Sequence, residues 1–230
     1  MNILVTGGGS GLGEAITREL ALEKTAHVFF TYCRSEENAL VMEKSFSNTT
    51  AIRVDFTKAG DIARLLQQMQ TMELDALVNN AITGIELKRF HEVEPEFYCE
   101  RFQKNVAPVI SITSQAIKIF RQRGKGNIIT VLTSYLSQTP PLGLSAYVAE
   151  KAYLASLSKS WASENSRFHI TANTVSPSFM STGLTKDLDQ RLIAGEAKNA
   201  LDPNVVAQKV SELLHGSDEV SGIDFMIKPS

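Results

Sequence analysis

Cysteine, tryptophan and long apolar runs are all scarce in this chain of 230 residues. The two cysteines, Cys33 and Cys99, are too few for a disulfide framework or a cysteine-based metal cluster, which favours a cytoplasmic location. Apolar runs end after a handful of residues, whereas a membrane helix needs about 20. Residues 1–6 have neither a basic region nor a cleavage site, so we expect no signal peptide.

An excess of charge of one sign is also missing. Lys plus Arg number 23 and Asp plus Glu number 25, so no polybasic field is available for a nucleic acid or an anionic membrane. The 4 histidines are scattered without metal-ligand spacing, and we predict no metal site. A content of 43% hydrophobic and 21% charged residues is typical of a globular protein. We therefore predict a single domain over residues 1–230.

Short apolar runs alternate with longer amphipathic stretches along the chain. Buried strands are predicted at residues 3–6, 28–32, 51–54, 76–78, 127–132, 170–175 and 225–227, and helices at residues 12–23, 36–46, 58–72, 96–121, 145–166 and 202–215. This alternation predicts an α/β fold with a single doubly wound parallel sheet, Rossmann-like, and helices on both faces. The irregular stretch at 178–199 is expected to form a flap over the substrate.

A glycine-rich turn separates the first strand from the first helix. Its sequence is Thr6-Gly7-Gly8-Gly9-Ser10-Gly11-Leu12-Gly13. Glycines let the backbone approach a pyrophosphate closely, and a helix N-terminus supplies free N–H groups. A mobile turn without a ligand is the alternative, but the position after an N-terminal strand favours a dinucleotide site. We predict cofactor contacts from Thr6, Gly7, Ser10, Gly11, Leu12 and Gly13.

The end of the second strand bears on which nucleotide is bound. Sites selective for NAD place Asp or Glu here to bind the adenosine ribose, but this strand ends in Tyr32-Cys33-Arg34. A guanidinium suits a 2′-phosphate, so Arg34 favours NADP(H), with NAD(H) as the alternative if Arg34 is only a solvated surface residue.

Three residues suit proton transfer to a carbonyl. Tyr147 and Lys151 are four apart in a predicted helix and share one face. A nearby ammonium is expected to lower the pKa of the tyrosine from about 10 toward neutrality. Ser134 follows the strand predicted at 127–132, at the sheet edge where such folds hold ligands.

These motifs together resemble the short-chain dehydrogenase/reductase family. The resemblance runs from Ile3 to about Thr182 and is closest to the 3-oxoacyl-acyl-carrier-protein reductase type. Besides the glycine turn, it rests on these residues: Asp55, Asn79-Asn80-Ala81, Asn105, Ser134, Tyr147, Lys151, Pro177 and Thr182.

The resemblance implies a role for each matching position. Ser134 orients the substrate, Tyr147 is the acid/base, and Lys151 binds the ribose. Asn105 holds a water for proton relay through that lysine. On the nucleotide, Asp55 contacts the adenine, Asn80 lies beside the adenosine side and is followed by Ala81, another cofactor-binding position, and Thr182, following Pro177, binds the carboxamide. Ile82 and Ser178 stand where the family commonly has glycine, and Lys228-Pro229-Ser230 replaces a Gly-Gly segment, which puts the usual tail-mediated subunit contacts in question.

The expected function is reduction of a ketone on a small or carrier-bound substrate, or the reverse oxidation, with a nicotinamide cofactor. The alternatives are a reductase or dehydrogenase for a cyclic alcohol, sugar or secondary metabolite, or a cofactor-binding regulatory protein without turnover. A homotetramer or homodimer is also expected, because the helices at 96–121 and 145–166 carry apolar residues on more than one face.

Overall fold

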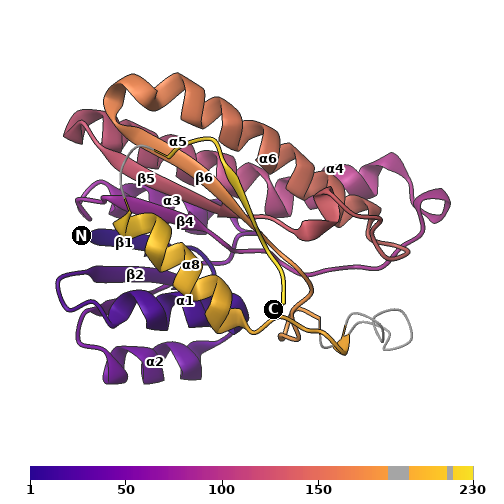
Figure 1. The fold of residues 1–230 in the computed structure, drawn as a ribbon, viewed down its shortest axis with the longest axis horizontal. Helices are drawn as coiled ribbons and strands as arrows, with labels where there is room; N and C mark the ends of the chain where they lie inside the picture. The colour runs from indigo at the N-terminus through magenta and orange to yellow at the C-terminus, as the bar shows by residue number, and fades with distance from the viewer. Residues whose placement is uncertain (186–196, 217–219, 230) are drawn as a thin grey trace.

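The computed structural model describes residues 1–185, 197–216 and 220–229, and it centres on one parallel sheet of seven strands (Figure 1). The strand order is β3-β2-β1-β4-β5-β6-β7, and every neighbouring pair is parallel. The strands are β1 (Asn2–Val5), β2 (His27–Tyr32), β3 (Thr49–Arg53), β4 (Ala76–Asn79), β5 (Gly126–Val131), β6 (Ile170–Pro177) and β7 (Asp224–Ile227). The order reverses between β1 and β4, so the predicted doubly wound fold is confirmed.

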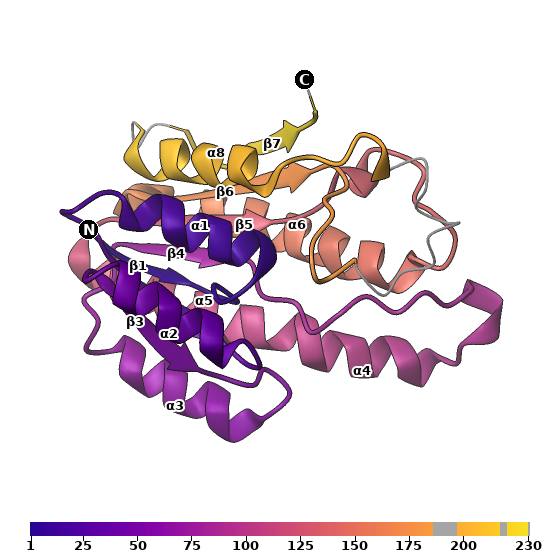
Figure 2. The same ribbon diagram turned by 90° about the horizontal axis from the view of Figure 1, so that it is seen from below.

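Helices cover both faces of the sheet (Figure 2). The helices are α1 (Gly11–Ala21), α2 (Glu36–Ser45), α3 (Ala59–Met69), α4 (Pro95–Asn105), α5 (Ala107–Arg123), α6 (Ser145–Asn165) and α8 (Pro203–His215). Buried residues of α1, α2 and α8 pack on one face, where α1 and α8 lie side by side (Figures 1 and 2). Residues of α3, α5 and α6 pack on the other face.

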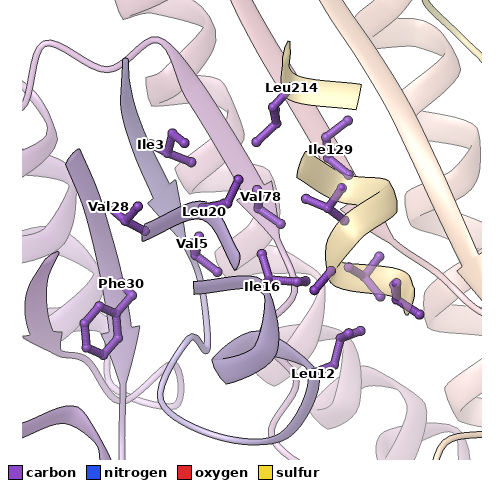
Figure 3. Close-up of a cluster of buried hydrophobic side chains, with 14 of the residues drawn as sticks. Ile3, Val5, Leu12, Ile16, Leu20, Val28, Phe30, Val78, Ile129 and Leu214 are labelled. Carbon is purple, nitrogen blue, oxygen red and sulfur yellow. The ribbon is translucent and has the colours of Figure 1, made fainter. Parts of the chain in front are cut away.

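A cluster of buried apolar side chains fills the space between β1, β2 and the helices α1 and α8 (Figure 3). Ile3 and Val5 on β1 lie beside Ile16 and Leu20 of α1, and all four are 0% exposed. Because helices cover both faces, successive strand residues are buried in opposite directions, which explains the continuous apolar runs. This packing fixes the strands side by side, so that their carboxyl ends and the residues that follow them lie along one edge of the sheet.

One helix prediction is wrong. The helix expected at 96–121 is two helices, α4 and α5, separated at Val106, whose φ is −105°. Pro108 provides the physical reason, because it has no N–H to donate to the carbonyl of Lys104 and so interrupts the ladder of helical hydrogen bonds. The break falls directly after Asn105, which is therefore the last residue of α4.

The flap expected at 178–199 is only partly covered by the described residues. Residues 186–196 lie outside them. Ser178 donates its N–H to the Ile227 carbonyl at 2.9 Å, and Leu201 donates to the Phe179 carbonyl at 2.8 Å. The first bond joins the start of the segment to β7. The second joins Leu201, which follows the segment, to Phe179 near its start.

Candidate active site

The glycine turn adopts a conformation that only glycine accepts easily. Gly7 and Gly11 have positive φ values of 68° and 56°, and Ser10 precedes the first turn of α1. A Cβ on Gly13 would lie 2.0 Å from the Gly7 carbonyl oxygen, and one on Gly7 would lie 2.9 Å from Cα of Ala81. The turn is therefore closely packed, and its shape depends on missing side chains.

Polar contacts hold this turn against the end of β4. The Thr6 hydroxyl accepts hydrogen bonds from the N–H groups of Asn80 and Ala81 at 3.0 and 3.1 Å. The Asn80 amide donates in turn to the Thr6 and Gly7 carbonyls at 3.0 and 3.2 Å. The structure thus brings together four residues predicted from the sequence, and Asn80 acts through the backbone of the turn.

Residues after β2 and β3 lie at the carboxyl ends of these strands, where the sequence predicts contacts with the nucleotide. Exposed Arg34 lines a surface hollow with Ser35, Glu36, Glu37 and Asn38. Two carboxylates therefore share this hollow with the predicted phosphate-binding guanidinium.

Asp55 follows β3 at the same end of the site. Its side chain accepts hydrogen bonds from the Thr57 hydroxyl at 2.7 Å and the Thr57 N–H at 3.0 Å, and these bonds hold the pKa of Asp55 below its usual range. The carboxylate is charged at neutral pH, and part of its hydrogen-bonding capacity is already used by Thr57.

Residues from β6 onward approach the glycine turn from the other side. Pro177 ends β6, and the Thr182 side chain lies close to Gly11, since a Cβ there would be 3.4 Å from Cβ of Thr182. The Ser178 hydroxyl is buried and has no hydrogen-bond partner among the described residues.

Three of the four predicted catalytic residues gather around the end of β5. Ser134 begins the 3-10 turn Ser134–Leu136, while Tyr147 and Lys151 lie in the first turns of α6. The Lys151 ammonium donates to the Val131 carbonyl at 2.7 Å and lies 5.9 Å from the centre of the Tyr147 ring. Ser134 is 2% and Lys151 5% exposed, whereas Tyr147 is partly exposed.

The electrostatics of the pair differ from the prediction. Burial raises the pKa of Tyr147 to about 12, an interaction with the Thr133 side chain opposes the rise, and the Glu150 carboxylate adds to it. Burial lowers the pKa of Lys151 to about 8, against the opposing effect of Glu150. The expected lowering of the tyrosine pKa by the ammonium is therefore wrong here, because Lys151 points to Val131 and the loss of hydration dominates.

Asn105, the fourth residue, has protein partners at both ends of its side-chain amide. Its oxygen accepts from the N–H and hydroxyl of Thr83 at 2.9 and 2.8 Å, and its nitrogen donates to both Glu150 oxygens at 3.2 Å. Glu150 is in turn paired with Arg101. The water-relay role of Asn105 stays a prediction, and the structure shows its side chain as a link between α6 and the segment after β4.

Sequence reasoning missed Thr83, Thr133, Arg101 and Glu150. Glu150 was detectable in part, because it lies three residues after Tyr147 and therefore near the same helix face. Arg101 and Thr83 gave no local signal, since their partners are far away in the sequence.

The residues present fit a nicotinamide dinucleotide. The glycine turn forms a close-packed cradle that side chains would fill, at the N-terminus of α1 and the carboxyl edge of the sheet. Thr182 lies close to Gly11 on the segment that follows β6, so this segment borders the cradle.

Comparison with known proteins agrees with this architecture. The profile of the family described as short chain dehydrogenase matches residues 1–192. The chain belongs to this family. It is accordingly an NAD(P)-dependent oxidoreductase of the short-chain dehydrogenase/reductase type, which confirms the resemblance found in the sequence.

Relatives within the family act on different substrates. The chain is 28% identical over 221 residues to a 3-oxoacyl-(acyl-carrier-protein) reductase of Escherichia coli K12, covering 95% of this chain and 85% of that protein. It is 32% identical over 190 residues to the 2,3-dihydro-2,3-dihydroxybenzoate dehydrogenase of the same organism, covering 81% and 72%. The crystal structure of a 3-ketoacyl-(acyl-carrier-protein) reductase from Brucella melitensis with NADH superimposes with a TM-score of 0.86 over 100% of this chain and 97% of that one, at 23% identity.

Within residues 1–185, 197–216 and 220–229, no group of three or more His, Cys, Asp or Glu side chains could hold a metal ion. In the same residues, no helix has the length and apolar character needed to cross a membrane.

Proposed function

We propose that the protein reduces the ketone of a 3-oxoacyl thioester or a similar substrate to a secondary alcohol, with NADPH as the reductant. The observation that carries the proposal is the position of Tyr147 and Lys151 beside Ser134, at the sheet edge that also holds the glycine cradle. The E. coli 3-oxoacyl reductase supports this substrate class, because its similarity extends over nearly the whole chain.

Proton transfer is assigned to Tyr147. Its hydroxyl is protonated at neutral pH and can give a proton to a carbonyl oxygen, although burial, which raises the pKa of Tyr147 to about 12, makes it a weaker acid than a free tyrosine. The nicotinamide, when bound, supplies the hydride that reaches the carbonyl carbon. Tyr147 gives its proton to the carbonyl oxygen, and Ser134 donates a hydrogen bond to the same oxygen to orient it.

Lys151 is assigned to the ribose and to the charge of the site. With a pKa near 8, Lys151 is mostly cationic at pH 7, and its ammonium, held at the Val131 carbonyl, would be available to donate to a ribose hydroxyl of the cofactor. Thr182 and Pro177 are assigned to the nicotinamide side of the cofactor. Asp55, Asn80 and Ala81 are assigned to the adenosine side.

A second candidate is a dehydrogenase or reductase for a cyclic alcohol, sugar or secondary metabolite. The 32% identity to the dihydrodihydroxybenzoate dehydrogenase favours it. A panel of acyl thioesters, cyclic ketones and sugars, assayed through NADPH and NADH absorbance, separates the two. The highest kcat/KM on a 3-oxoacyl thioester supports the first proposal, and the highest value on a cyclic substrate supports the second. Cofactor binding without turnover of any member would instead support a regulatory protein.

A homodimer or homotetramer formed through α4, α5 and α6 is also part of the proposal. Val106, Val109 and Leu154 are buried within one chain, but Leu157 and Trp161 are only partly covered. Tyr153 is 46% exposed, and its ring lies 5.2 Å from Phe102. Light scattering during size exclusion tests this: a mass near 25.2 kDa at micromolar concentration would contradict it.

A further inference from the structure

A buried ion pair joins α4 to the helix that carries the proposed catalytic residues. Arg101 donates from Nε to one Glu150 oxygen at 2.5 Å and from Nη2 to the other at 3.0 Å. Arg101 is 4% and Glu150 7% exposed. This is the paired geometry in which guanidinium–carboxylate contacts are strongest and most directional.

Two further elements converge on the same pair. The Asn105 amide donates to both Glu150 oxygens, and its own oxygen accepts from Thr83, so its orientation is determined from both sides. Arg101 also donates to the Gly84 carbonyl at 3.0 Å and lies 3.6 Å from Glu86. The pair therefore connects α4, the segment at residues 83–86 and α6 at one point.

Stability alone does not account for such a pair. Removing two charges from water is unfavourable, and apolar residues of similar size commonly give equal or greater stability. Glu150 directly precedes Lys151 and lies one turn after Tyr147, so its place in the helix is next to the reacting groups. A contact at this point is therefore placed to affect the geometry and the charge around Tyr147 and Lys151.

From this geometry we infer that Arg101 and Glu150 are positioning residues: they hold the Asn105 end of α4 and the 83–86 segment against the turn of α6 that bears Tyr147 and Lys151. Arg101 also balances the Glu150 charge, which acts on both of those residues. The inference rests on the proposed function, because it concerns the efficiency of that reaction.

The charged and titratable groups around Glu150 give the expected signs. Arg101 faces it from α4, and Tyr147 and Lys151 neighbour it on α6, while Glu86 faces Arg101 from the segment after β4. The carboxylate raises the pKa of Tyr147 and of Lys151. Removing the Glu150 charge should lower both pKa values, and removing the Arg101 charge should raise them.

The test compares Glu150→Gln, Arg101→Gln and the double variant. We expect kcat to fall by ~10-fold to ~10²-fold in each single variant, because small displacements of catalytic groups have effects of that size. The alkaline limb of the kcat/KM profile should move to lower pH in Glu150→Gln and to higher pH in Arg101→Gln, by roughly half a unit or more. The double variant should have a limb between those of the two single variants. Glu100→Gln is the matched control, because it removes an exposed carboxylate from α4, the helix that carries Arg101. It should leave the pH profile and kcat unchanged.

The affinity for NADPH, measured by its fluorescence across the same pH range, provides a readout without turnover. The pH at which this affinity is half lost should be lower in Glu150→Gln and higher in Arg101→Gln than in the wild type. Opposite shifts support the inference. Unchanged midpoints, with kcat and melting temperature falling together, would overturn it and leave only a structural pair. If Arg101→Gln does not fold, Glu150→Gln and the double variant decide by the same criterion. A wild-type protein that binds NADPH but reduces no ketone would contradict the proposed function instead, while the binding midpoints still test the positioning role.

Discussion

The proposed nucleotide-binding half of the site and the proposed catalytic half owe their shapes to different features of the chain. Around residues 6–13, the backbone and the absence of side chains make the shape, as the 2.0 Å approach at Gly13 shows. Around α4 and α6, buried charged side chains make it, with Arg101, Glu150 and Lys151 all less than 10% exposed. The shape of the first half depends on close backbone packing, and that of the second depends on a balance of charges.

This difference determines how each half responds to change. In the glycine turn, an added side-chain carbon would overlap backbone atoms, so its effect is steric. In the charged half, a substitution of the same shape can change protonation and orientation without displacing the fold.

The largest effect is expected from Tyr147→Phe. The variant keeps the ring but loses the proton donor, so kcat should fall by ~10² or more, the usual scale of acid–base catalysis. NADPH affinity should change little, because the glycine cradle is untouched. Stopped-flow oxidation of NADPH and fluorescence titration measure the two quantities, and a near wild-type kcat would contradict the assigned mechanism.

In the nucleotide half, Gly13→Ala should displace α1 from the turn. The new Cβ would meet the Gly7 carbonyl oxygen at 2.0 Å, and relieving that overlap should lower the free energy of unfolding by about 3 kcal/mol and weaken NADPH binding at least ~10-fold.

Gly60→Ala is the matched control for this variant. Gly60 lies in α3, and a Cβ there would meet nothing within 4 Å. This change should stabilise the protein by ~0.5–1 kcal/mol, because alanine favours the helix. Chemical denaturation measures both variants, and equal losses would show that the close packing of the turn is unimportant.

The fold and the nucleotide half could largely be predicted from the sequence. Strand and helix alternation identified the doubly wound sheet, and the glycine spacing identified the turn, because both patterns are local. The break between α4 and α5 was missed although Pro108 was visible in the sequence. Its effect was outweighed by apolar residues on both sides of it.

The catalytic half was less predictable. Tyr147 and Lys151 are four residues apart and could be found, but Arg101 meets Glu150 only after the chain has folded. The raised pKa of Tyr147 was missed for the same reason. It depends on burial and on where the Lys151 ammonium points, and neither is encoded in the spacing of the two residues.

A smaller effect, limited to one cofactor, is expected from Arg34→Ala. If the guanidinium pairs with a 2′-phosphate, NADP(H) should bind more weakly by roughly 1.5 kcal/mol, the lower end for a bond to a charged group, because Arg34 is exposed. NAD(H) should be nearly unaffected. Glu36→Gln in the same hollow is the opposite control and should strengthen NADP(H) slightly. Equal losses for both cofactors in Arg34→Ala would show that the arginine has only a structural role.

The smallest effect should come from Tyr98→Phe, which removes a neutral contact between the same two helices that Arg101 and Glu150 join. The Tyr98 hydroxyl and the Ser145 hydroxyl are 2.8 Å apart at the start of α6, and Phe would keep the ring contacts with Phe90 and Phe97. One neutral hydrogen bond contributes about 1 kcal/mol to the free energy of unfolding, so denaturation should show a loss near that value. The kcat should stay within about twofold, since no charge near Tyr147 changes.

Tyr153→Phe is the control on α6, because the Tyr153 hydroxyl has no hydrogen bond within the described residues. A loss of kcat in Tyr98→Phe as large as in Arg101→Gln would mean that contact between the helices, and not the balance of charge, sets the geometry of the catalytic half.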